Sequence, residues 1–318
     1  MPVKQGKYTL SLPSAPSVAG YAAVVGKKEG EGPLGAGFDY VYDDAAAGQK
    51  SWEKAESTMH GDAVNRALTK AGVTADEVDV AFAGDLLDQC IGSSFALRDS
   101  GMPFVGLYGA CSTMALSLAA AAVCVDARIA DIAVASTSSH FCSAEKQFRM
   151  PLEYGGQRTP TAQWTATAAG AAVISRADSK AKIDKVIIGR ICDYGVKDAN
   201  NMGAAMAPAA AATIADFLND TATKPEDYDM ILTGDLGAIG SELLQQKAEQ
   251  GKGQPPGEAQ HHVQPVQRIG GKGVLRELPD EPCLQFRKPC VHKDRYQYGC
   301  GASDGRDFVG GCRALKRP

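Results

Sequence analysis

The sequence lacks any apolar run long enough to cross a membrane. The longest, Leu118–Val125, falls far short of the ~20 residues that a transmembrane helix needs. The segment Met1–Leu12 also lacks an apolar stretch of the length that a signal peptide requires. We therefore expect a protein that is not secreted and that lies in the cytoplasm or on the surface of a membrane.

Positive charge and cysteine are also scarce. The chain of 318 residues has 33 Lys and Arg against 37 Asp and Glu, a net charge of −4. Since phosphate recognition needs clustered cations, we expect no nucleic-acid partner. The 9 cysteines include no paired CxxC motif. They are too few and too irregular for a disulfide scaffold, so we expect reduced thiols.

Short apolar runs alternate with helix-forming stretches through the first half of the chain. The predicted strands are Ser17–Val25, Val78–Gly84, Phe104–Tyr108, Ile132–Ala135 and Gly170–Ser175. The stretch Thr113–Ala127 is rich in Ala, Leu and Val and has no Gly or Pro, which indicates a buried helix. This alternation predicts an α/β fold in which helices cover both faces of a parallel or mixed sheet.

A repeated segment indicates an internal duplication. Asp76–Leu86 reads DEVDVAFAGDL and Glu226–Leu236 reads EDYDMILTGDL, at an offset of 226 − 76 = 150 residues. Each copy is an apolar run that ends in Gly-Asp, which is typical of a buried strand. A helical stretch precedes each copy, Asp62–Ala71 in the first and Ala205–Leu218 in the second. The sequence therefore predicts two similar α/β halves.

The composition changes near residue 248. The 70 residues from 249 to 318 hold 7 of the 16 prolines and 4 of the 9 cysteines, and they show no hydrophobic period. We predict a first half at 1–178, the start of a second half at 179–248 and an irregular tail at 249–318. Two interpretations of the tail stay open: a disordered or frameshifted terminus, and a metal or redox module built on its cysteines.

The segment Tyr108–Thr113 is the strongest candidate for chemistry. A strand ends there, small residues form a tight turn, and a helix begins at Cys111. Unpaired amides and the aligned peptide dipoles at a helix N-terminus favour negative charge. They can lower the pKa of a thiol and make it a nucleophile. The alternative is that Cys111 is a small packing residue in the core.

His140 is the second candidate, because it follows the predicted strand Ile132–Ala135 through a run of Ser and Thr. Ligand sites of α/β sheets lie beyond the carboxyl ends of the strands, so we expect Cys111 and His140 to face one pocket. The polar segment Glu145–Arg149 adds an arginine, which can grip carboxylates. His60 is expected in solvent at a helix start.

Gly109–Thr113 resembles the nucleophile turn of thiolase-fold condensing enzymes, whose two duplicated α/β halves agree with the repeat. The similarity is closer to one branch of that fold, the stage V sporulation protein AD family of spore-forming bacteria. It covers about residues 15–246 and is not recognised after about residue 247. The matching stretches are Gly32–Gly35, Gln49–Glu53, Ala83–Leu87, Gly109–Thr113, Ser138–His140, Ala144–Arg149, Glu153–Gln157, Met202–Gly203, Met206–Ala210 and Leu232–Leu236.

The resemblance implies a thiolase-like fold with two halves, of which the second is incomplete here. It also implies a non-catalytic protein that binds dipicolinic acid, as the calcium chelate, for uptake into the developing spore. Such a protein would lie in the cytoplasm or on the forespore or spore inner membrane, meet other stage V sporulation membrane proteins and form a homodimer.

Dipicolinate is a small planar dianion, so its site needs donor or cationic groups. The residues expected to bind it are Cys111, Ser139, His140, Glu145, Arg149 and Asp85. If calcium enters with the ligand, Asp85 or Glu145 is expected to hold the ion; otherwise we expect no cofactor and no metal site. Two alternatives stay open: an acyl-CoA condensing enzyme that uses Cys111, and a non-functional product of a frameshifted gene.

Overall fold

The computed structural model describes residues 1–148, 164–198 and 201–250. Six strands form its main sheet: β3 (Ser17–Val25), β4 (Tyr40–Val41), β5 (Val80–Asp85), β6 (Phe104–Gly106), β7 (Ile132–Ser139) and β8 (Ala168–Ser175). Their order across the sheet is β4-β3-β8-β7-β5-β6. β8 runs antiparallel to β3 and β7, and the other pairs are parallel. The fold class is therefore α/β with a mixed sheet, as the sequence predicts.

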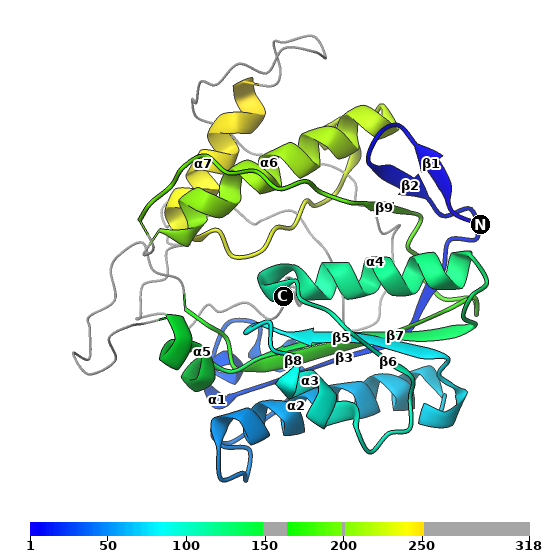
Figure 1. Ribbon diagram of the computed structural model, residues 1–318, viewed down its shortest axis with the longest axis vertical. Coiled ribbons are helices and arrows are strands. Elements are labelled where there is room, and N and C mark those ends of the chain that lie inside the picture. Colours follow the sequence, from blue (N-terminus) through cyan, green and yellow to red (C-terminus); the bar gives the residue numbers. More distant parts are fainter. Residues whose placement is uncertain (149–163, 199–200, 251–318) are drawn as a thin grey trace.

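Helices cover both faces of this sheet. α2 (Trp52–Ala71) and α3 (Ile91–Leu97) lie on one face, and α4 (Thr113–Asp126) lies on the other (Figure 1). Successive side chains of a strand point to opposite faces. Accordingly, Val134 of β7 joins the core under α2, whereas Ala133 and Ala135 join the core under α4. Burial of these apolar side chains holds the helices on the sheet.

All five predicted strands of the first half are present, but two helices differ from the prediction. α2 begins at Trp52, well before the predicted Asp62, because Ser51 caps it: the Lys54 amide donates to Ser51 Oγ at 3.3 Å. α4 is not buried on all sides, since Leu116 is 41% exposed. Only one side of α4 packs on the sheet.

The helices of the second half repeat those of the first. α6 (Met202–Thr221) has the same length as α2, 20 residues, and begins 202 − 52 = 150 residues after it. A 3₁₀ turn follows each helix, Ala75–Glu77 in the first half and Pro225–Asp227 in the second. The predicted duplication is therefore present at the level of helices and turns.

The strand predicted within Glu226–Leu236 is absent, and this prediction was wrong. Its counterpart β5 pairs with a strand on each side, whereas residues 229–236 have no partner strand in the described part of the chain. Leu232 is consequently 37% exposed. An apolar run forms a strand only where neighbouring strands take up its backbone hydrogen bonds.

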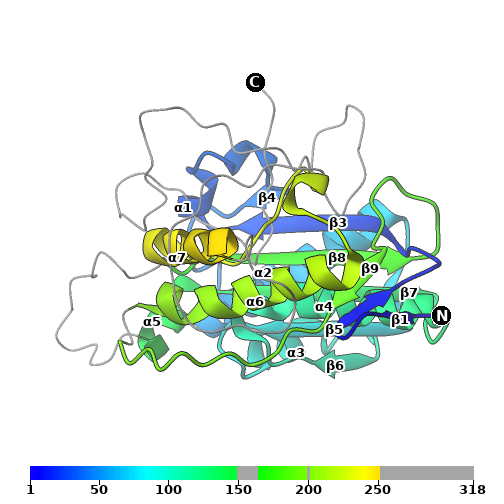
Figure 2. The same cartoon turned by 90° about the horizontal axis from the view of Figure 1, so that it is seen from above.

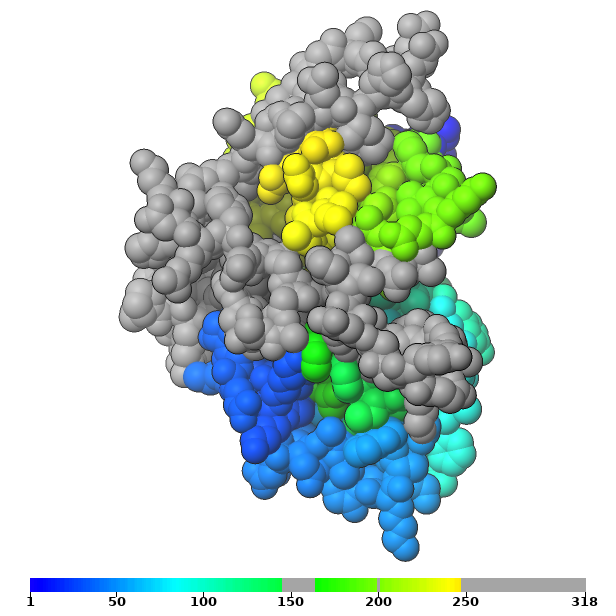
Figure 3. Space-filling model, turned by 90° about the vertical axis from the view of Figure 1, so that its left-hand side faces the viewer, coloured from blue at the N-terminus to red at the C-terminus, as the bar shows by residue number. Residues whose placement is uncertain are grey.

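The second-half helices lie above α4, on the side away from the main sheet (Figures 1 and 2). α7 (Gly237–Gln250) packs on α6, and α6 also contacts a small antiparallel sheet. That sheet consists of β1 (Val3–Gln5), β2 (Thr9–Ser11) and β9 (Lys185–Ile187). Figure 3 shows α7, in yellow, higher on that side of the molecule than the blue surface of the first half.

Two short helices complete the described elements, α1 (Lys27–Gly30) and α5 (Phe141–Phe148). No helix formed by the described residues is both long and apolar enough to cross a bilayer. The predicted tail at 249–318 lies outside the described residues, except for 249–250 at the end of α7.

Candidate functional site

The carboxyl ends of β5, β7 and β6 lie at one edge of the main sheet, because these strands are parallel neighbours. Asp85 ends β5, Ser139 ends β7, and His140 follows directly; Cys111 comes five residues after the last residue of β6, Gly106. This edge is where ligand sites form in α/β sheets. Four of the six residues expected to bind ligand therefore belong to one edge.

Cys111 lies in a 3₁₀ turn, Ala110–Ser112, that leads directly into α4. The preceding Ala110 has φ 42°, in the left-handed region that costs an L-residue roughly 1–2 kcal/mol. Its amide donates a hydrogen bond of 2.7 Å to Asp88 Oδ1. Left-handed non-glycine residues cluster at functional sites, so the strain marks this turn as a candidate.

The surroundings of Cys111 disfavour the thiolate form of its side chain. The residue is exposed, yet its pKa is raised above the ordinary value, chiefly by desolvation and also by the negative charges of Asp235 and Asp88. Its own amide favours the thiolate but is outweighed. At neutral pH the turn therefore holds a protonated thiol. Since Asp235 belongs to the second half, the thiol lies where the two halves meet.

His140 is buried on the side of the sheet that α2 covers. Its Nε2 donates to the Ala45 carbonyl at 2.7 Å, and its Nδ1 accepts from the Cys142 amide at 3.2 Å. These two roles define a neutral ring, which stacks on Trp52 with centroids 5.4 Å apart. Cys111 lies in the turn that leads into α4, the helix on the opposite face of the sheet. A pocket shared by Cys111 and His140 stays a prediction.

α2 and β7 share a row of buried polar contacts that sequence reasoning missed. Every second residue of β7 meets every fourth residue of α2, because both spacings bring side chains to one face. Ser138 Oγ donates to Glu56 Oε1 at 2.9 Å, and His60 Nε2 shares a 2.8 Å hydrogen bond with Ser136 Oγ. His60 is 0% exposed, so its predicted place in solvent is wrong. The row could have been predicted from the alternation of side chains along β7 together with a helix that begins at Trp52.

Burial shifts the pKa of each titratable group in this row. Desolvation raises the pKa of Glu56 to about 7, although Ser138 donates a hydrogen bond to it. Desolvation lowers the pKa of His60 to about 4. Desolvation also raises the pKa of nearby Asp85, against the opposing effect of the amides of Gln89 and of Gly92 and Ser93 at the start of α3. The interior behind the site thus favours uncharged forms.

The remaining predicted ligand residues have these positions. Ser139 Oγ donates to the Ala166 carbonyl at 2.7 Å. Asp85 is 3% exposed and accepts from the Gln89 amide at 3.1 Å. Glu145 lies in α5 but its side chain is outside the described part, and Arg149 is outside the described residues. Within the described part, no group of three or more His, Cys, Asp or Glu side chains is placed to hold a metal ion.

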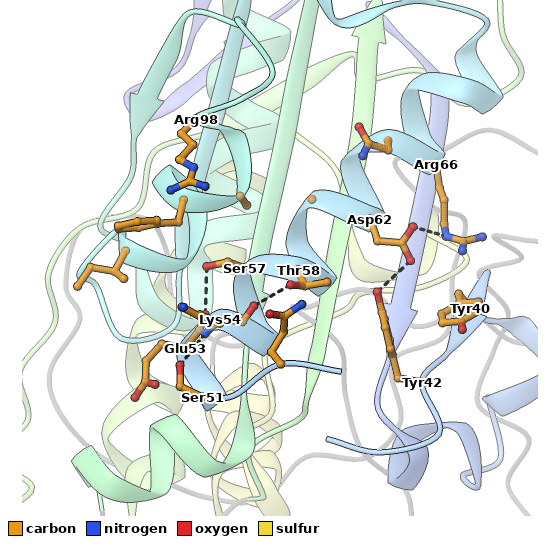
Figure 4. A pocket seen from close by; sticks show the side chains of 16 residues that line it. Tyr40, Tyr42, Ser51, Glu53, Lys54, Ser57, Thr58, Asp62, Arg66 and Arg98 are labelled. Carbon is orange, nitrogen blue, oxygen red and sulfur yellow. Dashed lines mark hydrogen bonds and ion pairs between the residues drawn. The ribbon is translucent and has the colours of Figure 1, made fainter. Parts of the chain in front are cut away.

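A separate groove of about 1070 Å³ runs along the outer side of α2 (Figure 4). In it the Tyr42 hydroxyl donates to Asp62 at 3.3 Å, and Arg66 Nε donates to the same carboxylate at 2.8 Å. The Arg66 guanidinium also lies 4.7 Å from the centre of the Tyr40 ring. The lining includes none of the six ligand residues expected from the sequence, so this groove is distinct from the sheet-edge site.

The fold is thiolase-like. The structure of 3-oxoacyl-(acyl carrier protein) synthase III from Xanthomonas oryzae matches with a TM-score of 0.52 and 14% identity, over 86% of this chain and 87% of that one. The structure of OleA from Xanthomonas campestris with bound cerulenin matches with a TM-score of 0.52 and 14% identity, over 81% of this chain and 83% of that one. At such low identity the likeness shows the fold alone.

Sequence comparison is more specific. The family model of stage V sporulation protein AD matches residues 6–255. Stage V sporulation protein AD of Bacillus subtilis strain 168 is 46% identical over 226 residues, which is 71% of this chain. The chain therefore belongs to the stage V sporulation protein AD family. It spans 66% of the length of that relative, slightly under two thirds.

Proposed function

We propose that this protein binds dipicolinate, as its calcium chelate, for uptake into the developing spore, and that it catalyses no covalent step. Membership of a sporulation family with a thiolase-like fold supports the setting. The observation that carries the choice of binding over catalysis is the raised pKa of Cys111. A protonated thiol donates a hydrogen bond to a ligand but is a poor nucleophile.

Acyl transfer, the competing function, needs a thiolate and a base that generates it. His140 was the one base expected from the sequence, and its two ring nitrogens hydrogen-bond to backbone groups of Ala45 and Cys142. Among the described contacts no side-chain base hydrogen-bonds to the sulfur of Cys111. These observations favour binding.

The charges near Cys111 favour a chelate over the free dianion. The carboxylates of Asp88 and Asp235 act on this thiol, and they would repel a ligand of charge −2. Calcium offsets that charge and prefers oxygen ligands. In this proposal dipicolinate and water supply most of the oxygen ligands of the ion. Arg149 and Glu145 remain proposed contacts.

The proposal extends to location and assembly. We place the protein in the cytoplasm or on the surface of the forespore or spore inner membrane, in contact with other stage V sporulation membrane proteins. A homodimer is supported by β6, the last strand of the main sheet, where Phe104 and Val105 are 38% and 43% exposed. An apolar sheet edge of this kind favours pairing with a second copy.

The test is a thermal titration of the purified full chain with dipicolinate, with and without calcium. Bound ligand at 100 times its Kd adds about 2.7 kcal/mol, which raises the Tm by several degrees. Isophthalate is the matched control, because it carries the same two carboxylates without the chelating ring nitrogen. We expect the calcium–dipicolinate pair to raise the Tm and isophthalate to leave it unchanged.

A second measurement separates the alternatives. The chain is incubated with acyl-CoA, and the mass of the peptide that contains Cys111 is measured by mass spectrometry. An acyl adduct on Cys111 without any dipicolinate shift would replace our proposal with the acyltransferase. A chain that shows no cooperative unfolding by circular dichroism would favour the non-functional product instead.

A further inference from the structure

Two loops meet beside Cys111: one follows β5 and the other follows β6. Three non-glycine residues in them have positive φ, namely Asp88 at 55°, Cys90 at 53° and Ala110 at 42°. Such backbone persists only where surrounding contacts impose it. The contacts between these loops therefore decide the conformation of the residue that precedes the thiol.

Asp88 supplies the link to the cysteine turn. Its Oδ1 accepts from the Ala110 amide at 2.7 Å, while its own amide donates to the Asp85 carbonyl at 3.2 Å. A second link joins the same loops, since Cys90 Sγ donates to the Leu107 carbonyl at 3.4 Å. Asp88 thus connects the end of β5 with the residue just before Cys111.

We propose that Asp88 is a positioning residue of the ligand site. Its carboxylate holds Ala110 in the left-handed conformation and so sets the direction of the Cys111 side chain. The identity of the ligand rests on the proposed function, whereas the geometry does not. A hydrogen bond from a backbone amide to a charged acceptor is among the stronger ones in proteins, so one carboxylate can impose this conformation.

The same carboxylate also places negative charge near the thiol, together with Asp235 from the second half. Position and charge can be separated by two substitutions. Asp88→Asn keeps an acceptor oxygen for the Ala110 amide and removes the charge. Asp88→Ala removes both the acceptor oxygen and the charge. A purely electrostatic role makes the two variants behave alike, whereas a positioning role makes them differ.

The experiment measures alkylation of Cys111 by iodoacetamide across pH, with the modified peptide quantified by mass spectrometry. The midpoint reports the ionisation of the thiol, and the plateau rate at high pH reports its accessibility. For Asp88→Asn we expect a midpoint at lower pH with the plateau of the unaltered protein. For Asp88→Ala we expect a changed plateau and about tenfold weaker dipicolinate binding.

Two controls make the result specific. Asp99→Asn removes an exposed carboxylate that pairs with Arg98 near the end of α3, and it should leave Cys111 labelling unchanged. The far-UV circular dichroism spectrum of each variant reports any general loss of structure. If Asp88→Ala keeps the plateau of the unaltered protein and shifts only the midpoint, as Asp88→Asn does, the inference is overturned. If no form binds dipicolinate but Asp88→Ala still alters the plateau, the proposed function fails and the positioning role stands.

Discussion

Glu56 and His60 lie one helical turn apart on the buried face of α2, and each hydrogen-bonds to a serine of β7. Because burial penalises the charged form, it moves their pKa values in opposite directions: to about 7 for Glu56 and to about 4 for His60. Their effects on stability therefore have opposite dependence on pH. Between about pH 4.5 and pH 6.5 the fall in stability with pH due to Glu56 and the rise due to His60 offset each other.

Replacing Glu56 removes one of these slopes. The folded pKa of Glu56 lies above its unfolded value, so its contribution to stability is present below about pH 4.5 and is lost as pH rises to about 7. Glu56→Gln should gain stability relative to the unaltered protein over that range, by on the order of 3 kcal/mol. Urea unfolding at a series of pH values measures this difference.

His60→Gln serves as the matched variant in the same titration. The folded pKa of His60 lies below its unfolded value, so the unaltered protein loses stability as pH falls from about 6.5 to about 4. This variant should therefore gain relative stability toward acid, opposite to Glu56→Gln. Parallel pH profiles for the two variants would show that burial does not govern these groups.

Residue-level reasoning from sequence found Cys111 and missed most of its surroundings. The strand-to-helix turn was visible in the composition of Tyr108–Thr113. The pKa of its thiol was not, because the sign depends on desolvation and on Asp235, which lies far away in the chain. His60 was predicted to lie in solvent because the polar residues before Asp62 gave no sign that α2 begins at Trp52.

At the scale of elements, a predicted strand is present where the main sheet offers it a partner strand. β3 matches its predicted bounds, Ser17–Val25, because its apolar run is paired along its whole length with β8. The run at 229–236 has similar composition but no partner strand among the described residues. Local pattern sets the propensity for a strand, and pairing across the sheet decides the outcome.

The contact between α2 and β3 offers a test at this scale. At Gly20 of β3, an added Cβ would lie 2.5 Å from the Ala67 carbonyl oxygen and 2.6 Å from the Ala71 amide nitrogen. Both are backbone atoms of α2, so the helix must move. Gly20→Ala should therefore destabilise the protein by about 1–3 kcal/mol, the usual range for overpacking. Urea unfolding monitored by circular dichroism measures the loss.

Gly170→Ala on the adjacent strand β8 is the matched control. Among the described residues, the atom nearest to its Cβ would be the Ala22 carbonyl oxygen, at 4.0 Å. This substitution should cost far less than Gly20→Ala. Equal losses would mean that the cost comes from glycine in a strand, not from the close approach of α2.

At the scale of the whole molecule, the two halves are repeated in helices but unequal in packing. α2 buries eight of its 20 residues against the main sheet, whereas α6 buries three, Gly203, Ala207 and Pro208. Pro208 also removes one backbone hydrogen bond from the interior of α6. Within the described part of the chain, α6 is therefore held by fewer buried residues than α2.

A charged side chain of α6, Asp220, connects this helix to the N-terminal segment of the chain. Asp220 accepts hydrogen bonds from the amides of Lys7, Tyr8 and Thr9 at 2.8, 2.7 and 2.9 Å. These bonds lower the pKa of Asp220. They connect the last turn of α6 to the β1–β2 hairpin, so the hairpin and α6 are expected to loosen together.

Hydrogen exchange read by mass spectrometry tests this difference between the halves. Amides of α6 should exchange roughly a hundredfold faster than those of α2, because local opening of α6 exposes much less buried surface. Asp220→Ala should accelerate exchange in α6 and in the β1–β2 hairpin and leave α2 unchanged. Equal protection of α2 and α6 would show that the halves open as one cooperative unit. Acceleration in α2 as well would show that Asp220 stabilises the entire fold and not only the contact of α6 with the hairpin.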